Sequence, residues 1–265
     1  RFFPFSNWVE ELKDFQVLKA DIIAGLTVAL VLVPQSMAYA QLAGLPPYYG
    51  LYASFLPVAL AALFGSSRQL ATGPVAVVSL LTAAALEPIA GANPEGYIAY
   101  AIMLALLVGI FQLLLGILKM GVLVDFLSHP VVNGFTNAAA IIIGTSQLSK
   151  IFGVVVPTEP HHYETIINVL SEAINSTHSP TFIMGISAIL IIVLIRKFFP
   201  KYPAVLISVS ITTFISWFIN FESIYGGKIV GVIPEGLPNF QIPIIDFSQI
   251  VHLGTVAIII SLIGF

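Results

Sequence analysis

Residues 22–43 read IIAGLTVALVLVPQSMAYAQLA, and this stretch decides the fold class. It contains no charged side chain, and about 20 helical residues are enough to cross the roughly 30 Å hydrocarbon core of a bilayer. A charged segment precedes it, and no small-residue cleavage site closes a short apolar core near it. The pattern is therefore that of a retained membrane anchor and not of a signal peptide.

The composition of the whole chain agrees with this interpretation. Of its 265 residues, 58% are hydrophobic and only 9% are charged, against about 25% charged in an average soluble domain. The net charge of -3 and the scattered cations argue against a nucleic-acid partner. The absence of cysteine excludes disulfides and thiol catalysis. We therefore expect membrane lipid around the protein.

Further apolar runs follow along the chain and predict seven complete spans and the start of an eighth. A β-barrel would need apolar residues at every second position, which a run such as residues 138–144 (AAAIIIG) does not show. Helices are the other way to satisfy the backbone in lipid. The predicted spans are 22–43, 47–64, 74–86, 98–118, 131–148, 181–195, 202–219 and 251 onward.

The spans imply an order of segments along the chain. Residues 1–21 form a cytoplasmic amino-terminal segment, 22–219 hold spans one to seven, 220–250 form an extracellular connection, and 251–265 begin span eight. With the amino terminus in the cytoplasm, eight of the ten Lys and Arg residues fall inside and two outside, as the positive-inside rule requires. Apolar residues at helical spacing in 163–174 also predict a helix between spans five and six that lies on the outer membrane surface. The apolar end at Phe265 leads us to expect a fragment of a longer chain.

The third span, residues 74–86, is too short to cross by itself, because its 13 residues give about 20 Å of helix. Residues 66–73 would then enter the membrane as extended chain. Gly73 and Pro74 are typical of a helix start, with Pro74 at the first helical position. This arrangement predicts free backbone N–H groups at Val75, Ala76 and Val77 near mid-membrane, which favour an anion. The alternative is an ordinary short core helix that starts with a proline.

The first span contains the other polar candidates. Gln35 and Ser36 follow Pro34, which removes a helical hydrogen bond, so they lie where a substrate could use them. Tyr39, one turn further, would form the wall of a pocket. The alternative is a kink satisfied by neighbouring helices, with Tyr39 packed against them.

Charged residues do not lie well inside spans one to seven, where a proton relay or sodium site normally uses a carboxylate. We therefore expect a coupling ion, Na⁺ or H⁺, to bind outside this stretch, and we expect no other cofactor and no metal site. A membrane enzyme is disfavoured, because no carboxylate pair, metal-ligand cluster or Ser/His/Asp set lies within the spans.

Four sequence strings carry a family resemblance: residues 34–40 (PQSMAYA), 44–52 (GLPPYYGLY), 64–68 (FGSSR) and 72–74 (TGP). In this order and spacing they resemble the SulP anion transporter family, which includes sulfate permeases and bicarbonate or chloride transporters. The likeness continues through residues 134–136 (GFT) and 233–238 (IPEGLP), so it covers essentially the whole chain.

The resemblance implies an all-α integral membrane protein with the uracil-permease-like fold, in which two inverted repeats of seven spans precede a cytoplasmic STAS domain. This chain would be the first repeat, without the second repeat and the STAS domain. The family holds its anion between the amino termini of the third and tenth spans, with help from the first. Mapped by motif, the site residues are Gln35, Ser36, Tyr39, Gly73, Pro74, Val75, Ala76 and Val77.

The expected function is secondary active transport, by symport and alternating access, of a small inorganic anion, sulfate first and bicarbonate next. The full-length protein would be a homodimer in the plasma membrane or the bacterial inner membrane. An uncoupled anion channel, a chloride/bicarbonate exchanger, and a nucleobase permease of the same fold are the alternatives. Half of the site would lie in the second repeat, so we expect this chain alone not to transport.

Overall fold

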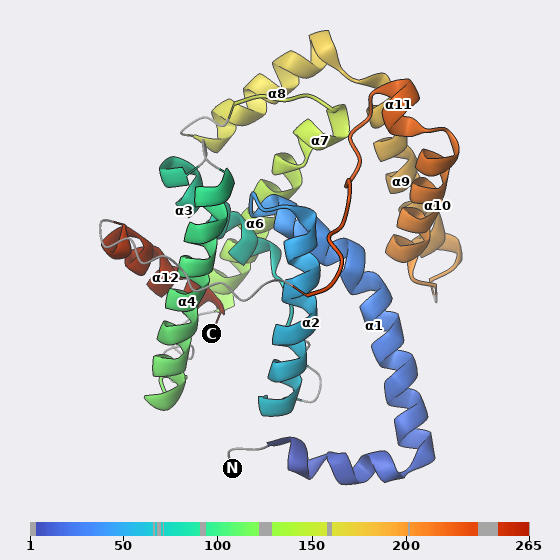
Figure 1. Cartoon of the computed structure of the whole chain (residues 1–265). Helices are drawn as coiled ribbons and strands as arrows, with labels where there is room; N and C mark the ends of the chain where they lie inside the picture. The colour runs from blue at the N-terminus through green and yellow to red at the C-terminus, as the bar shows by residue number, and fades with distance from the viewer. Residues whose placement is uncertain are drawn as a thin grey trace. The chain divides into compact units, whose positions relative to one another are not determined.

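The computed structural model describes residues 4–65, 67, 70, 72–90, 94–121, 129–157, 161–200, 202–237 and 249–264. Throughout this described part, regular secondary structure is helical and no strand occurs (Figure 1). Two short 3₁₀ helices, η1 (Pro4–Asn7) and η2 (Val9–Lys13), come first. The α-helices are α1 (Phe15–Leu42), α2 (Pro47–Phe64), α3 (Ala76–Ala90), α4 (Pro94–Ile117), α6 (His129–Ser146), α7 (Leu148–Phe152), α8 (His162–Ser176), α9 (Ser179–Phe198), α10 (Ala204–Phe218), α11 (Phe221–Tyr225) and α12 (Ile250–Gly264).

Each predicted span corresponds to a helix, and the second coincides with α2 at both ends. The others differ by a few residues, most of all α1, which begins at Phe15 and not at Ile22. Hydropathy marks the part of a helix that lipid can accept, whereas the helix itself continues through polar residues such as Lys19. The helix predicted between spans five and six is α8, which is confirmed.

Within the described residues, four helices are long and apolar enough to cross a membrane: α1, α2, α4 over Gly96–Ile117, and α9. Helices α3, α10 and α12 are apolar but have only 15 residues each. At 1.5 Å per residue this gives about 22 Å, which is less than the roughly 30 Å of a hydrocarbon core. The predicted shortness of the third span is thus confirmed, although its bounds were wrong.

The chain divides into two compact units. Unit 1 comprises Arg1–Glu10, Gln35–Asn137 and Pro234–Phe265, and unit 2 comprises Glu11–Pro34 and Ala138–Ile233. Helix α1 passes from unit 2 to unit 1 directly after Pro34, which lies inside it without ending it.

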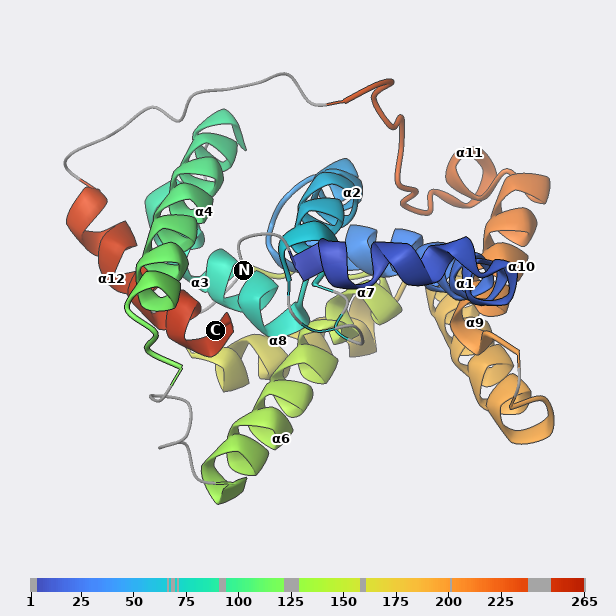
Figure 2. The same cartoon turned by 90° about the horizontal axis from the view of Figure 1, so that it is seen from below.

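The core of unit 1 lies where α3, α4 and α12 pack against one another, as Figures 1 and 2 both show. Leu86 of α3, Leu104 of α4 and Leu253 of α12 are almost completely buried there. Ser261 donates its hydroxyl hydrogen bond within α12, to the Ala257 carbonyl at 2.6 Å, and approaches the Val108 carbonyl of α4 at 3.2 Å. A small hydroxyl satisfied in this way allows two apolar helices to approach closely.

The connection from α1 to α2 is tied to the start of α4. Tyr97 is buried, and its hydroxyl donates to the Ala43 carbonyl at 2.8 Å. The next residue, Gly44, has a φ of +74°, and a Cβ built on it would overlap the Tyr97 hydroxyl. Glycine is therefore required at this turn both for the backbone conformation and for the space.

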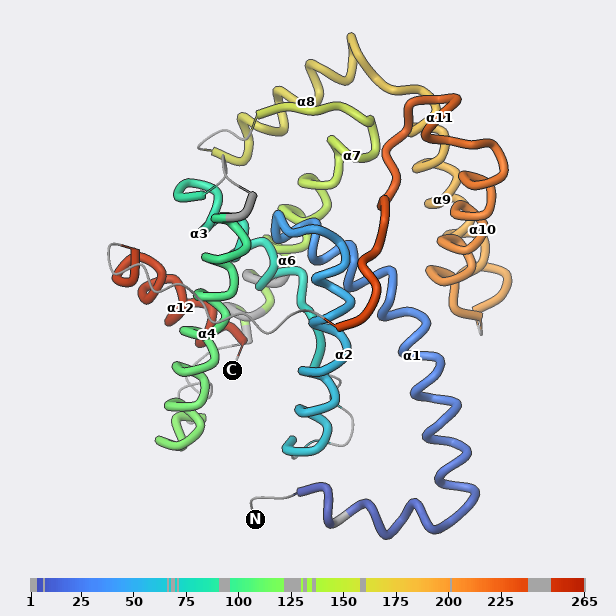
Figure 3. The backbone as a smooth tube through the Cα atoms, viewed as in Figure 1, coloured from blue at the N-terminus to red at the C-terminus, as the bar shows by residue number. Residues whose placement is uncertain are grey.

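Unit 2 is built on the pair α9 and α10, joined by a short connection and packed along each other (Figure 3). The Ser208 hydroxyl of α10 donates to the Ala188 carbonyl of α9 at 2.9 Å and is buried. Helix α7 packs against both α8 and α9. Gly153 ends α7 in the left-handed conformation and lies against the Cβ of His178.

Candidate functional site

The start of α3 lies two residues later than predicted. Its first backbone hydrogen bond runs from the Ser79 N–H to the Val75 carbonyl at 3.0 Å, and Ala76 is the first helical residue. Pro74 therefore precedes the helix and does not open it, which corrects the prediction. A proline disfavours helical conformation in the residue before it, and residues 72–75 remain outside any regular element. The N–H groups without an intrahelical acceptor are consequently those of Val75 to Val78.

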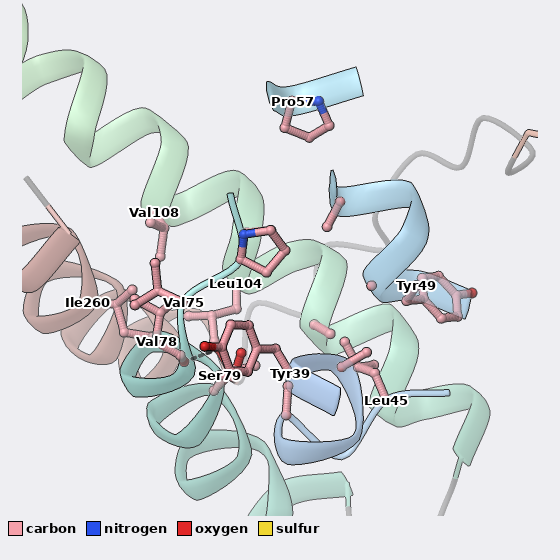
Figure 4. A pocket seen from close by; sticks show the side chains of 18 of the residues that line it. Tyr39, Leu45, Tyr49, Pro57, Val75, Val78, Ser79, Leu104, Val108 and Ile260 are labelled. Carbon is pink, nitrogen blue, oxygen red and sulfur yellow. Dashed lines mark hydrogen bonds between the residues drawn. The ribbon is translucent and has the colours of Figure 1, made fainter. Parts of the chain in front are cut away.

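A cavity of about 430 Å³ lies at this helix start, entirely within unit 1 (Figure 4). Its walls come from the end of α1, the first part of α2, residues 72–75, α3, α4 and one residue of α12. Most lining side chains are small or aliphatic, and none of the described lining residues carries a charge. The polar ones among them are Tyr39, Tyr49, Thr72, Ser79, Thr82 and Gln112.

Four of the predicted site residues line this cavity: Tyr39, Gly73, Pro74 and Val75. Gln35 is outside the lining, but its Nε2 donates to the Tyr39 hydroxyl at 2.8 Å. In that bond the hydroxyl oxygen of Tyr39 is the acceptor. The hydroxyl proton of Tyr39 is therefore available for donation to another partner.

The other three predicted residues do not line the cavity. Ser36 is fully buried, with 0% of its surface exposed, and its carbonyl lies against Gly50 of α2. Ala76 and Val77 belong to the first turn of α3 without forming part of the cavity wall. The structure thus gives Ser36 a position in the contact between α1 and α2, and its predicted role in substrate binding stays a prediction.

The structure adds polar residues that the sequence did not reveal. Ser79 lies one turn after Val75, and helix side chains lean toward the amino terminus, so its hydroxyl lies on the Val75 side of α3. Figure 4 shows Tyr39, Val75, Val78 and Ser79 gathered at this end of the helix. The Thr82 hydroxyl already donates to the Val78 carbonyl at 2.9 Å. Ser79 was overlooked because a serine in an apolar helix is usually satisfied by its own backbone.

Gln112 of α4 is the other addition, and here a signal was present. An amide in the middle of a predicted span is expensive in lipid and normally faces the protein interior. The structure places it in the cavity wall, near the end of α12. Searching the fourth span for polar residues would have identified it.

These groups together favour an anion. The amino terminus of a helix carries a partial positive charge and unpaired N–H donors, and both act more strongly where water is scarce. Hydroxyl groups from Tyr39 and Ser79 can add donors without adding charge. The described lining contains no Asp, Glu, His, Lys or Arg, so its polar groups are hydroxyls, an amide and backbone groups.

A comparison with known families decides the identity. The profile of the sulfate permease family matches residues 18–265, nearly the whole chain. The chain belongs to the sulfate permease family. The resemblance drawn from the four sequence strings is therefore confirmed. This is a family of transporters and not of enzymes.

Curated members of the sulfate permease family are similar to this chain over most of its length. Sulfate transporter 4.1, chloroplastic, of Arabidopsis thaliana is 43% identical over 250 residues, which cover 91% of this chain and 36% of the relative. A probable sulfate transporter of Mycobacterium tuberculosis (strain ATCC 25618 / H37Rv) is 37% identical over 259 residues, which cover 97% of this chain and 46% of the relative. The chain spans less than half the length of these relatives.

Solved structures of the sulfate permease family confirm the fold class. SLC26A9 matches with a TM-score of 0.89 at 27% identity, covering 99% of this chain and 44% of that one. The transmembrane domain of a cyanobacterium bicarbonate transporter, BicA, matches with a TM-score of 0.81 at 24% identity, covering 94% and 63%, and supports the fold alone. The protein is an all-α integral membrane protein with the inverted-repeat fold of its family.

Proposed function

We propose that this chain is the first repeat of a secondary active transporter that moves a small inorganic anion across a membrane by alternating access. Sulfate is the first candidate substrate and bicarbonate the second. The observation that carries the proposal is the uncharged cavity at the amino terminus of α3, lined by Tyr39, Val75 and Ser79. Its donors are N–H and O–H groups, which bind oxyanions without trapping them by full charges.

The choice of substrate is supported by the relatives. The curated ones are described as sulfate transporters, whereas bicarbonate is kept as the second candidate from the sequence resemblance alone. Sulfate offers four oxygens as acceptors and can use several donors around one cavity at the same time.

Other parts of the proposal concern the whole protein. Its amino terminus lies in the cytoplasm, since that orientation leaves eight of ten cationic residues inside. The coupling ion, H⁺ or Na⁺, binds outside the described cavity, whose lining has no carboxylate. Residues 1–21, 22–219, 220–250 and 251–265 have the segment roles given above, and the complete protein is a homodimer.

An uncoupled anion channel or an exchanger would use the same cavity, and only coupling to an ion gradient separates these from a symporter. A nucleobase permease is the more distant alternative. It would recognise a flat ring through paired donors and acceptors, and uracil would then compete with the labelled substrate.

The test is uptake of radiolabelled sulfate and bicarbonate by proteoliposomes containing the full-length transporter, under imposed proton or sodium gradients. Ser79→Phe fills the cavity, and we expect uptake to fall roughly fivefold or more, since forcing a bulky ring into an occupied site costs about 1–3 kcal/mol. Ala84→Phe is the matched control, because Ala84 is an exposed residue of the same helix outside the cavity wall.

Saturable uptake that Ser79→Phe abolishes and Ala84→Phe preserves would support the proposal. Equal uptake by both variants would place the site elsewhere. Competition by uracil with no uptake of either anion would favour the nucleobase permease, and uptake indifferent to both gradients would favour the channel or exchanger.

A further inference from the structure

Helix α8 exposes a continuous row of large apolar side chains. The exposed fractions are 60% for Tyr163, 60% for Ile167, 45% for Leu170 and 86% for Ile174. Their spacing of four, three and four residues places them on one side of the helix. We call these four residues the apolar row of α8. Such a row is unusual on a surface that faces water.

The remaining sides of α8 are different in character. Val169 and Ala173 are buried, and α8 packs against α7. Ser171, Glu172 and Asn175 are exposed and polar, and they lie on a third side. One side of α8 therefore packs against the protein, a second side is polar and exposed, and the third side is apolar and exposed.

The carboxyl end of α8 is fixed to the beginning of a membrane helix. Only Thr177 and His178 separate it from α9, a helix of 20 residues that is apolar enough to span a bilayer. The chain turns between the two, so α8 runs across the end of α9 and does not prolong it (Figures 1 and 3).

His178 holds this turn through three hydrogen bonds. Its backbone N–H donates to the Phe152 carbonyl at 3.0 Å, at the end of α7. Its Nε2 lies 2.7 Å from the Tyr225 carbonyl of α11 and must carry the proton, because a carbonyl oxygen can only accept. Its Nδ1 lies 2.7 Å from the Thr181 hydroxyl in the first turn of α9. The level of α8 relative to the start of α9 is therefore set by the fold.

We infer that the apolar row of α8 is a lipid-binding surface, which lies in the boundary between headgroups and acyl chains of the leaflet where α9 begins. The row is held at the level at which α9 enters the bilayer, and α9 itself exposes apolar side chains from its first turns onward, Ile183 among them at 64%. The polar side of α8 then faces water, as in other helices that lie in a membrane surface.

The chemistry of the helix points to neutral lipid. Residues 162–176 contain two acidic residues and neither Lys nor Arg, so anionic headgroups gain nothing from it. Binding instead depends on burying the apolar row. Tyr163 at one end of the row suits the boundary, since its ring is apolar and its hydroxyl bonds to the Glu164 carboxylate at 3.1 Å. This inference goes beyond the proposed transport function and does not depend on the anion carried.

Spin labelling tests the inference in the full-length transporter, reconstituted in nanodiscs of phosphatidylcholine. This chain has no cysteine of its own, so Ile167→Cys and Ile174→Cys each add one labelling site to it. The measurement is the collision rate of each nitroxide with oxygen, which concentrates in lipid, and with a nickel chelate, which stays in water.

We expect the ratio of oxygen to nickel collisions at Ile167 and Ile174 to equal that at Ile183→Cys, an exposed position in the first turns of α9, and to exceed that at Ser171→Cys on the water side of α8. All four substitutions are at exposed positions, so none removes a buried contact. A nickel-accessible label at Ile174, equal to that at Ser171, would overturn the inference. Protection from both reagents would also overturn it, because a protein partner would then cover the row.

Discussion

Gly50 and Ser36 determine how closely α1 and α2 approach in unit 1. A Cβ built on Gly50 would overlap the Ser36 carbonyl oxygen, and Ser36 is completely buried. Since backbone atoms and not a flexible side chain would have to move, no larger residue fits here. The contact also explains why the serine of the first span is withheld from the cavity while Tyr39, on another side of α1, reaches it.

Replacing Gly50 by alanine should therefore destabilise unit 1. We expect a loss of about 1–3 kcal/mol, the usual cost of overpacking, visible as a lower midpoint of thermal unfolding in detergent. Gly25→Ala in α1 is the control, because a Cβ there meets nothing within 4 Å, and alanine stabilises a helix interior by roughly 0.5–1 kcal/mol. Equal midpoints for the two variants would show that the helices can separate at no cost.

Ser79 allows a finer test of the cavity. Ser79→Ala removes a hydroxyl that can donate to a bound oxyanion, and the loss of one net hydrogen bond of about 1 kcal/mol should raise KM for sulfate roughly fivefold. Thr82→Val is the comparison, since the Thr82 proton is already donated to the Val78 carbonyl, and we expect a smaller change. Initial uptake rates over a range of sulfate concentrations provide both values, and unchanged KM in Ser79→Ala would exclude the hydroxyl from binding.

At the scale of elements, α3 is an apolar helix that is shorter than a membrane span. Its 15 residues cannot span the bilayer, and Val75 and Val78 at its amino-terminal end line the cavity. A shorter helix thus produces a polar end within an apolar environment without any charged side chain. The proposed anion site depends on this end of α3.

A carboxylate attached at the helix start should compete with the anion. Val75 occupies the capping position and is 53% exposed, so Val75→Asp can direct its side chain to the free N–H groups of α3. We expect uptake to fall at least about tenfold, since this cap and the dipole together supply more than 1.4 kcal/mol. Val75→Asn caps without charge and should reduce uptake less.

Measured uptake of sulfate by the two Val75 variants in proteoliposomes checks this. If the aspartate variant transported as well as the unchanged protein, the amino terminus of α3 could not be the anion site. Thermal unfolding of both variants, expected at or above the midpoint of the unchanged protein, separates competition from misfolding.

At the scale of the whole molecule, the distribution of charge predicts an orientation in the membrane. Lys228 follows α11 in the connection predicted to be extracellular, and Arg196 lies in the last turn of α9, at an end predicted to be cytoplasmic. In the proposed topology, the seventh span, residues 202–219, separates the two positions. They should therefore respond oppositely to a reagent that cannot cross the membrane.

Lys228→Cys should react with a membrane-impermeant thiol reagent in intact cells, whereas Arg196→Cys should react only after the membrane is opened. This chain contains no cysteine that would add a background signal. The reverse pattern would invert the proposed orientation. Labelling of both positions in intact cells would contradict the single membrane crossing proposed between Arg196 and Lys228.

The sequence by itself determined that the protein lies in a membrane, where most of its spans fall, and to which family it belongs. These features are local, because the length and apolarity of a segment decide whether lipid accepts it, and strings such as residues 34–40 can be compared without a fold. The amino-terminal end of the third span was also anticipated, though two residues too early.

Only the tertiary structure decided which side chains meet at that end. Tyr39, Ser79, Gln112 and Ile260 are far apart in the chain and belong to four different helices, yet they line one cavity. Ser36, in contrast, is one turn from Tyr39, is fully buried, and has its backbone carbonyl against Gly50 of a neighbouring helix. Hydropathy treats every side of a helix in lipid alike, whereas the side that faces the cavity depends on how the helices pack.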